Sequence, residues 1–392
     1  MDYQEKNLMK DDILTGLSRW CCDIFENRIV KIILFVIFVI HSSLALIQIY
    51  FIIYVFNSKE FASYGPFFFG IFLSLGSMRL ILFKSHIYNQ IGADFDLWEI
   101  DEENADSVIK ETKLITVIVQ AALVLTIVVG FAFVLPTSSD YDRFFAVRLI
   151  CDYCPNYSQI LYYLYKLTIP VVGYAMAVPP VMFTYYAQHI CYQLMMLSKH
   201  IRFSSDPVQR REDDLEKLIY DENYQKEFHR RIVFCIRREI VFTEMIVKKN
   251  DELSYLIGFF FITSCALGIS IILFVMMFSD MIFKEKLMLV RITCLSVLAC
   301  FFFSIGILSG QAAEDETNQI VENVCAIEWY FLNRSNARTY MIFLSYNMKM
   351  RRFEFLNTSV NLQLGVAIGR QIYGIGSVLL NLKSRFVTVV KT

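Results

Sequence analysis

Seven long apolar stretches, separated by loops of unequal positive charge, constrain the fold of this chain more than any other feature. Six of them contain no formal charge except Arg79: Ile32–Phe56, Phe61–Phe83, Leu114–Thr137, Leu167–Ser198, Leu253–Ser279 and Ile292–Ala313. The seventh is interrupted by Arg370 and runs from about Phe355 to Leu382. About 20 predominantly apolar helical residues cross a hydrocarbon core of roughly 30 Å. Since none of the stretches alternates with period two, we predict an all-α, seven-transmembrane helical protein.

The composition agrees with a multi-pass protein of the lipid bilayer. Hydrophobic residues make up 56% of the chain and charged residues only 19%. A soluble domain contains about 25% charged residues. The formal net charge of −1 favours no nucleic-acid partner. We therefore expect lipid around the chain and no binding of nucleic acid.

The distribution of Lys and Arg predicts which side of the membrane each loop occupies. The loop Lys199–Lys249 holds twelve of these residues, whereas Ser138–Tyr165 holds only Arg143 and Arg148. Basic loops stay in the cytoplasm, and the rule is strongest for charges close to the ends of the spans. We therefore predict an intracellular N-terminus and, after seven spans, an extracellular C-terminus.

One glycosylation sequon agrees with this topology. Asn156-Tyr157-Ser158 lies in the loop that is predicted to be extracellular. Two further sequons begin at Asn333 and Asn357, in segments predicted to be inside the cell or at the membrane. Asn156 is therefore the predicted glycosylation site.

The predicted orientation argues against a G-protein-coupled receptor, whose seven helices start from an extracellular N-terminus. The chain also lacks a Glu/Asp-Arg-Tyr run at the end of the third span and an Asn-Pro-x-x-Tyr run in the seventh. A secondary transporter is less favoured as well, because many transporters have two halves with corresponding broken spans. Seven spans do not divide evenly into two halves.

The long segments that are predicted to lie inside the cell carry apolar residues at helical spacing. Glu212–Lys249 is predicted as an amphipathic helix. The pattern returns from Ile320 to Phe331 and from Tyr340 to Tyr346, with a polar break at Asn333–Asn336. These helices either pack on their own chain or form an interface between subunits.

The order of these features resembles the insect odorant receptor family. A basic helical loop precedes the fifth span, and Gly310-Gln311 ends the sixth. A helix with Trp329-Tyr330, a second helix, the basic group Lys349–Arg352 and a final short span follow. Gln193, Leu194 and Leu197, at the end of the fourth span, are also similar to that family.

The related gustatory receptors share this fold, but their usual signature is absent. That signature is Thr-Tyr, five apolar residues and Gln-Phe, whereas Thr339-Tyr340 is followed here by Ser345-Tyr346. A gustatory-type channel for soluble tastants is therefore the alternative, and an odorant receptor the main interpretation.

The resemblance implies an odour-gated, non-selective cation channel in the plasma membrane of sensory neurons. The odorant-tuning subunit binds a small volatile molecule and assembles with a shared coreceptor into a heterotetramer. The implied organisation has a six-helix transmembrane domain at residues 1–313, with a cytoplasmic helical loop at 198–250. Cytoplasmic anchor helices follow at 314–354, and a pore-lining seventh helix at 355–385.

We expect the odorant pocket among the outer halves of spans two to six. Aromatic rings with a few hydroxyl groups suit a small, mostly apolar ligand with one or two hydrogen-bonding groups. Aromatic residues near span ends also serve as interfacial anchors, which is the alternative for each of them. The predicted ligand-binding residues are Tyr64, Phe67, Phe68, Phe131, Phe133, Tyr165, Tyr174, Met176, Phe274 and Met277.

The resemblance also implies that the last span lines the pore, where apolar rings can close a channel by dewetting. Position from the end of this span identifies Val378 as the gate, with Ser377 and Leu382 beside it. Arg370 departs from the pattern, because a cation in the pore would repel permeant cations. We expect Arg370 to face a neighbouring helix or the wide inner vestibule, and Arg79 to snorkel to the inner interface.

The sequence contains no motif for catalysis or metal binding. The five His residues are scattered. Cys151-Asp152-Tyr153-Cys154 stands alone, whereas a zinc site needs two more ligands. These two cysteines form a disulfide with each other or have partners elsewhere. No phosphate-binding loop or nucleophile motif is present, so we expect neither an enzyme nor a cofactor.

Overall fold

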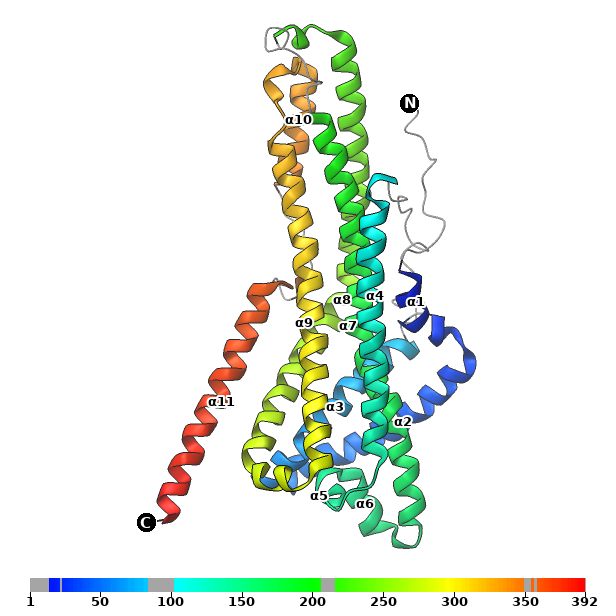
Figure 1. Cartoon of the computed structure of the whole chain (residues 1–392), viewed down its shortest axis with the longest axis vertical. Coiled ribbons are helices and arrows are strands. Elements are labelled where there is room, and N and C mark those ends of the chain that lie inside the picture. The colour runs from blue at the N-terminus through cyan, green and yellow to red at the C-terminus, as the bar shows by residue number, and fades with distance from the viewer. Residues whose placement is uncertain are drawn as a thin grey trace.

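The computed structural model describes residues 14–21, 23–83, 102–205, 216–348, 354–355 and 358–391, and helices dominate this part of the chain (Figure 1). The α-helices are α1 (Thr15–Cys21), α2 (Arg28–Tyr54), α3 (Ser58–Phe83), α4 (Glu102–Val134), α5 (Asp140–Arg143), α6 (Phe145–Tyr153), α7 (Ser158–Ser205), α8 (Glu222–Lys284), α9 (Lys286–Cys325), α10 (Arg334–Asn347) and α11 (Leu362–Lys391). Short 3₁₀-helices are η1 (Asp23–Glu26), η4 (Pro155–Tyr157), η6 (Glu216–Ile219) and η7 (Trp329–Phe331). One antiparallel pair of short strands joins β1 (Glu354–Phe355) to β2 (Thr358–Ser359). The prediction of an all-α fold is confirmed.

Six helices of the described chain are long and apolar enough to cross a membrane, namely α2, α3, α4, α7, α8 and α9. They contain four of the first six predicted spans completely, whereas α2 ends at Tyr54 and α4 at Val134, shortly before the predicted ends at Phe56 and Thr137. The helix in the position of the seventh, α11, begins at Leu362 rather than near Phe355. Phe355 pairs with Thr358 instead, and the side chain of Asn361 accepts a hydrogen bond from the Leu364 amide at the start of α11.

Three of the spans belong to helices that extend well beyond a bilayer. Helices α7, α8 and α9 contain 48, 63 and 40 residues. The predicted amphipathic helix Glu212–Lys249 is confirmed from Glu222 onward, where α8 continues into the fifth span; residues 212–215 lie outside the described part. Helices α5 and α6 lie at one end of the molecule, and α10 lies at the other (Figure 1).

Hydrogen bonds from Asn residues join α10 to α8 at the far end of the bundle. Asn333 caps α10, since its side chain accepts a hydrogen bond from the Asn336 amide at 2.9 Å. The buried Asn336 side chain donates to the carbonyl and to the side-chain oxygen of Gln225, both at 2.8 Å. The predicted polar break is therefore a buried junction that packs α10 on its own chain.

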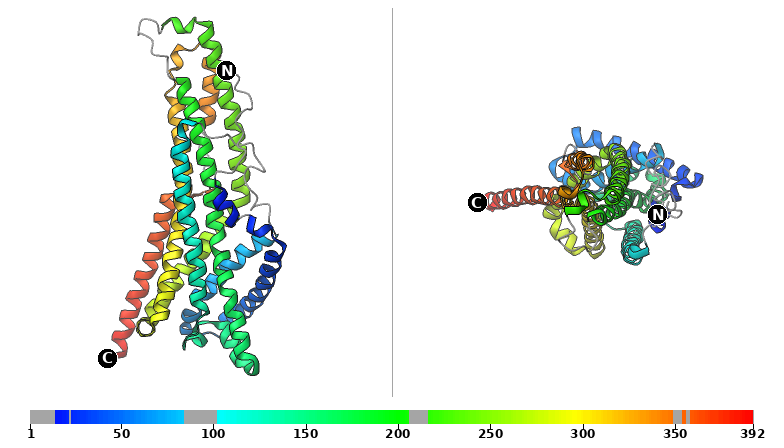
Figure 2. Two further views of the ribbon diagram at one scale, coloured as in Figure 1. Left: turned by 45° about the vertical axis from the view of Figure 1, so that its right-hand side comes forward. Right: turned by 90° about the horizontal axis from the view of Figure 1, so that it is seen from above.

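Helix α11 leaves the bundle and projects away from it (Figure 2). Its first residues are anchored to α9 through Gly310-Gln311. Gln311 Oε1 accepts a hydrogen bond from the Leu362 amide at 3.1 Å, and Asn361 donates to Glu314 at 2.9 Å. A Cβ atom at Gly310 would lie 2.0 Å from the Val360 carbonyl oxygen, so this close approach requires glycine.

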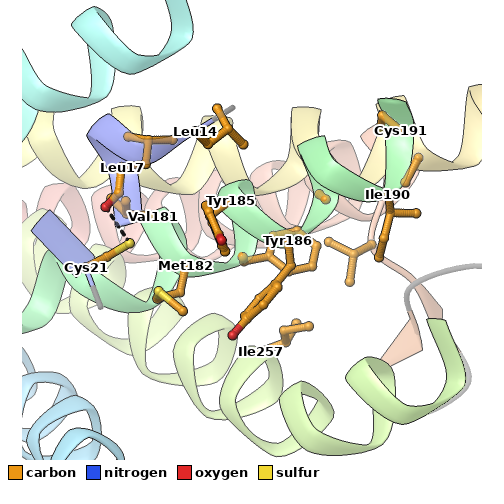
Figure 3. Close-up of a cluster of buried hydrophobic side chains, with 14 of the residues drawn as sticks. Leu14, Leu17, Cys21, Val181, Met182, Tyr185, Tyr186, Ile190, Cys191 and Ile257 are labelled. Atoms are coloured by element: carbon orange, nitrogen blue, oxygen red, sulfur yellow. Dashed lines mark hydrogen bonds between the residues drawn. The ribbon is translucent and has the colours of Figure 1, made fainter. Parts of the chain in front are cut away.

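The middle of α7 forms the centre of the hydrophobic core. Figure 3 shows its buried side chains between α1 and α8. The residues labelled there are Leu14, Leu17, Cys21, Val181, Met182, Tyr185, Tyr186, Ile190, Cys191 and Ile257. Because α7 is buried on nearly every side in this region, its hydroxyl groups bond within the protein. Thr184, for example, donates a hydrogen bond to the Pro180 carbonyl at 2.9 Å, which satisfies its buried hydroxyl group.

Candidate ligand-binding cavity

A cavity of about 90 Å³ lies between five helices, in the half of the bundle nearer to α5 and α6. Such a volume accommodates a few water molecules or one small organic molecule. Its lining is almost entirely apolar, which suits a small ligand with few polar groups. The lining residues are His41, Pro66, Phe67, Gly70, Ile71, Ser74, Thr126, Val129, Gly130, Phe133, Phe144, Tyr165, Ile169, Val172, Gly173, Met176, Leu295, Leu298 and Phe302.

Four of the ten predicted ligand-binding residues line this cavity: Phe67, Phe133, Tyr165 and Met176. The rings of Phe67 and Phe133 meet edge to face, with 5.6 Å between their centroids. Phe67 also lies 4.3 Å from the ring of Phe144. These aromatic contacts bring α3, α4 and the segment before α6 together around one space, although ligand binding by the four residues stays a prediction.

Two other predicted residues are buried next to arginines outside the cavity. The Tyr64 hydroxyl lies 3.4 Å from a guanidinium nitrogen of Arg148. Phe274 lies under the guanidinium of Arg143, 4.7 Å from the ring centroid. Both residues therefore belong to the polar region between α3, α5, α6 and α8.

The remaining four point elsewhere. Phe131 and Met277 are 55% and 47% exposed. Phe68 stacks on Phe72, and the Tyr174 hydroxyl donates to the carbonyl oxygen of Trp20. Neighbouring positions on a helix differ by about 100° in direction, so proximity to a span end does not determine which residues face the interior.

Two groups of cavity residues were not predicted from the sequence: the polar residues and those on α9. His41 and Thr126 contribute polar groups from α2 and α4, and Leu295, Leu298 and Phe302 form the side contributed by α9. The one available signal for His41 was its position as an ionisable residue inside the first predicted span, because such a residue usually faces the protein interior.

A buried ion cluster supports the cavity wall. Asp140 Oδ2 lies 3.0 Å from Lys166 Nζ, and Asp140 Oδ1 lies 3.3 Å from Arg291 Nη1. All three side chains are buried. The Lys166 ammonium lies 3.5 Å from the centroid of the Phe144 ring, and the Arg291 guanidinium lies 5.3 Å from that of Phe133. Both rings line the cavity, so the cluster lies directly behind them.

The protonation of Asp140 reflects these partners. Burial acts to raise the pKa of its carboxyl, but the ammonium of Lys166 and hydrogen bonds from Tyr162 and Thr137 outweigh it. The pKa of Asp140 is therefore lowered, and the residue is a carboxylate at neutral pH. One negative charge thus lies between two buried cations, and the three side chains together carry a net positive charge.

The predicted gate lies on α11. Val378 is 59% exposed and Ser377 is partly exposed. Leu382 lies within α11, but its side chain is outside the described part. Arg370 and Arg79 are both exposed, on α11 and α3 respectively. Their pore-facing or lipid-facing roles stay predictions.

The loop after α6 is open to solvent. Asn156 lies exposed in η4, and Cys151 and Cys154 are free and exposed. These two cysteines form no disulfide with each other here. Among the described residues, no group of three or more His, Cys, Asp or Glu side chains could hold a metal ion.

Comparison with known proteins supports the predicted resemblance at the level of fold. No family model matches the chain, and no curated protein matches it in sequence. Its structure is similar to that of the insect olfactory receptor OR5 from Machilis hrabei, with a TM-score of 0.64. The similarity covers 94% of this chain and 97% of that one, at 10% sequence identity. The chain therefore has the fold of an insect olfactory receptor over almost its whole length.

Proposed function

We propose that this protein is an odorant receptor subunit, in which a small volatile molecule bound in the cavity opens a non-selective cation channel. The observation that carries the proposal is the similarity to an insect olfactory receptor over 94% of the chain. The apolar cavity within the same helices gives that fold a place for a small ligand.

The chemistry of the cavity is consistent with an odorant. A volatile molecule offers mainly apolar surface, which the rings of Phe67, Phe133 and Phe144 would cover. Few polar groups line the space, and no charged residue lines it among the described ones. Such a site favours neutral molecules over the ionic substrates of many transporters.

The exposed surface of α11 supports an assembly of several subunits around a pore. Val366, Tyr373 and Val378 are exposed on this projecting helix. In the proposed channel, the α11 helices of four subunits would surround the ion path. At the opposite end of the molecule, Trp329 and Ile342 are exposed and would contact neighbouring subunits below the membrane.

The proposed assembly is a heterotetramer with the shared coreceptor, in the plasma membrane of sensory neurons. The charge of the loop between spans four and five supports an intracellular N-terminus. In that orientation α10 lies in the cytoplasm, and the cavity lies in the outer half of the membrane domain.

Electrical recording tests the proposal. Cells would express the chain together with a coreceptor and be exposed to a broad panel of volatile molecules. We expect an odour-evoked, non-selective cation current that is absent from cells with the coreceptor alone. No current to any member of the panel, although surface labelling shows both proteins, would overturn the proposal.

A further inference from the structure

His41 is a buried polar side chain between two cavities. It is only 1% exposed and contributes to the cavity of about 90 Å³. It also contributes to a second space of about 10 Å³, which is lined by Gln48 and Phe145 among others. The side chains of Phe67, Ile71, Phe144 and Tyr165 line both spaces, as His41 does, and so form the partition between them.

Hydrogen bonds determine which nitrogen of His41 carries the proton. The Thr168 hydroxyl donates its only hydrogen to the Tyr165 carbonyl, at 2.6 Å. His41 Nε2 lies 2.7 Å from the same hydroxyl oxygen. Because the Tyr165 carbonyl can only accept, the hydroxyl hydrogen points towards it, and we assign the Thr168 oxygen as the acceptor and Nε2 as the protonated nitrogen.

The other ring nitrogen is then an acceptor. No charged residue of the described chain lines either space, so a buried imidazolium would have no counter-ion there and the ring is neutral. A neutral imidazole with its proton on Nε2 presents a lone pair on Nδ1. Nδ1 is buried and has no hydrogen-bond partner within the described residues. An acceptor in this state is costly to the protein, and a bound donor removes the cost.

We propose that the cavity selects small, mainly apolar molecules that carry one hydrogen-bond donor, namely alcohols and phenols, and that His41 Nδ1 accepts their hydrogen bond. The proposal rests on the function proposed above and specifies its ligand class. Nδ1 is covered in this structure. A ligand therefore reaches it when a side chain of the partition, such as Tyr165 or Phe144, shifts and joins the two spaces.

Molecules of the same size without a donor would bind less well. An ether or an ester has only acceptor oxygens, so its oxygen would face the lone pair of Nδ1 and leave it unsatisfied. Sites that hydrogen-bond a ligand hydroxyl discriminate strongly against analogues that cannot form the bond. The isomers hexan-1-ol and methyl pentyl ether, and likewise p-cresol and anisole, isolate this difference because each pair has the same atoms.

Binding of these four probes to the purified full-length chain in lipid nanodiscs tests the proposal. Ligand-induced shifts in the thermal unfolding midpoint give the affinities. We expect each hydroxyl compound to bind about tenfold more tightly than its ether isomer, a difference of about 1.4 kcal/mol. Equal affinities within both pairs, or no binding of any probe, would overturn the proposal. The proposed channel function is tested separately, by currents to the broad panel.

Variants of His41 and of its hydrogen-bond partner Thr168 test the role of the imidazole directly. His41→Phe keeps a ring but removes the acceptor, so hexan-1-ol should bind no better than its ether isomer. In Thr168→Val the hydroxyl that accepts from Nε2 is absent, so the His41 ring proton can occupy either nitrogen and the preference for the alcohol should shrink. This variant replaces His41→Phe in the test if His41→Phe does not fold. Thr263→Val on α8 is the matched control, because the buried Thr263 hydroxyl donates to the Phe259 carbonyl of its own helix and lines neither space. An alcohol preference that persists in both test variants would contradict the role of His41.

Discussion

Lys166 Nζ lies 3.5 Å from the centroid of the Phe144 ring, so the charge of a buried ion cluster rests against the wall of the ligand cavity. Asp140 is the carboxylate of that cluster, and it joins α5 to Lys166 of α7 and Arg291 of α9. The cluster thereby connects the segment before α6 to two of the spans that form the cavity.

Removal of the carboxylate should destabilise the protein strongly. In Asp140→Asn, Lys166 and Arg291 would remain as two buried cations without a counter-ion, which costs about 3–5 kcal/mol. We expect a clear fall in the thermal unfolding midpoint of the purified chain. Glu222→Gln is the matched control, because the Glu222–Lys226 pair is exposed and an exposed pair contributes little. Equal midpoints for Asp140→Asn and wild type would show that the cluster is not stabilising.

The same cluster should give a pH dependence of defined sign. The pKa of Asp140 is lowered in the folded state, below an ordinary value of about 3.9. Its carboxylate therefore stabilises the fold at any pH above that value, and the stabilisation is lost as the pH falls through the lowered pKa. Below about pH 4 the unfolding midpoint of wild type should fall towards that of Asp140→Asn, because the carboxylate is then protonated in wild type and absent from the variant. An acid-dependent fall that is as steep in Asp140→Asn as in wild type would contradict the assignment.

Gly130 should not tolerate a larger side chain. A Cβ atom there would lie 2.6 Å from the Cα of Pro170, where α4 and α7 approach at the edge of the cavity. Gly130→Ala would force the two helices apart, and overpacking of this kind typically costs 1–3 kcal/mol, so we expect a loss of about that size. Gly306→Ala on α9 is the control, since nothing lies within 4 Å of its Cβ position. Thermal unfolding of both variants checks the expectation, which fails if they are equally stable.

Gly310 should control the attachment of α11. In Gly310→Ala the new Cβ would meet the Val360 carbonyl, and the Gln311 and Asn361 hydrogen bonds that hold the start of α11 would be strained. We expect a large loss of odour-evoked current together with retained ligand binding. Gly369→Ala, on α11 itself, has open space at its Cβ position and should conduct normally. Normal current in Gly310→Ala would mean that this contact does not couple α11 to the bundle.

The sequence was sufficient to predict six of the seven spans, because length and apolar content are local properties of the chain. The helix in the position of the seventh, α11, begins at Leu362 and is not among the described helices that are long and apolar enough to cross a membrane. Gly310-Gln311 was noted in the sequence only as the end of the sixth span; the close approach of Val360 and the hydrogen bond to Leu362 were not predicted. The polar break at Asn333–Asn336 marked a real helix boundary because Asn333 caps α10.

The cavity residues were less accessible to sequence reasoning because they depend on the rotation of each helix. Phe131 and Phe133 lie two positions apart, yet Phe131 is exposed and Phe133 lines the cavity. The ion cluster was missed for a different reason. Lys166 and Arg291 each lie just outside a predicted span and far apart in sequence, so only the folded arrangement brings them to Asp140.

In the proposed channel, a ligand in the cavity opens an ion path that is lined by α11. To test this, Val378→Cys is expressed with the coreceptor and treated with a charged thiol-reactive reagent. The rate at which the reagent changes the odour-evoked current is measured, and the rate in wild type is subtracted as background. Val297→Cys on α9 is an exposed control away from α11. We expect the reagent to reduce the current of Val378→Cys alone, and to do so faster during odorant application. Complete labelling of Val378→Cys without any change in odour-evoked current would contradict it.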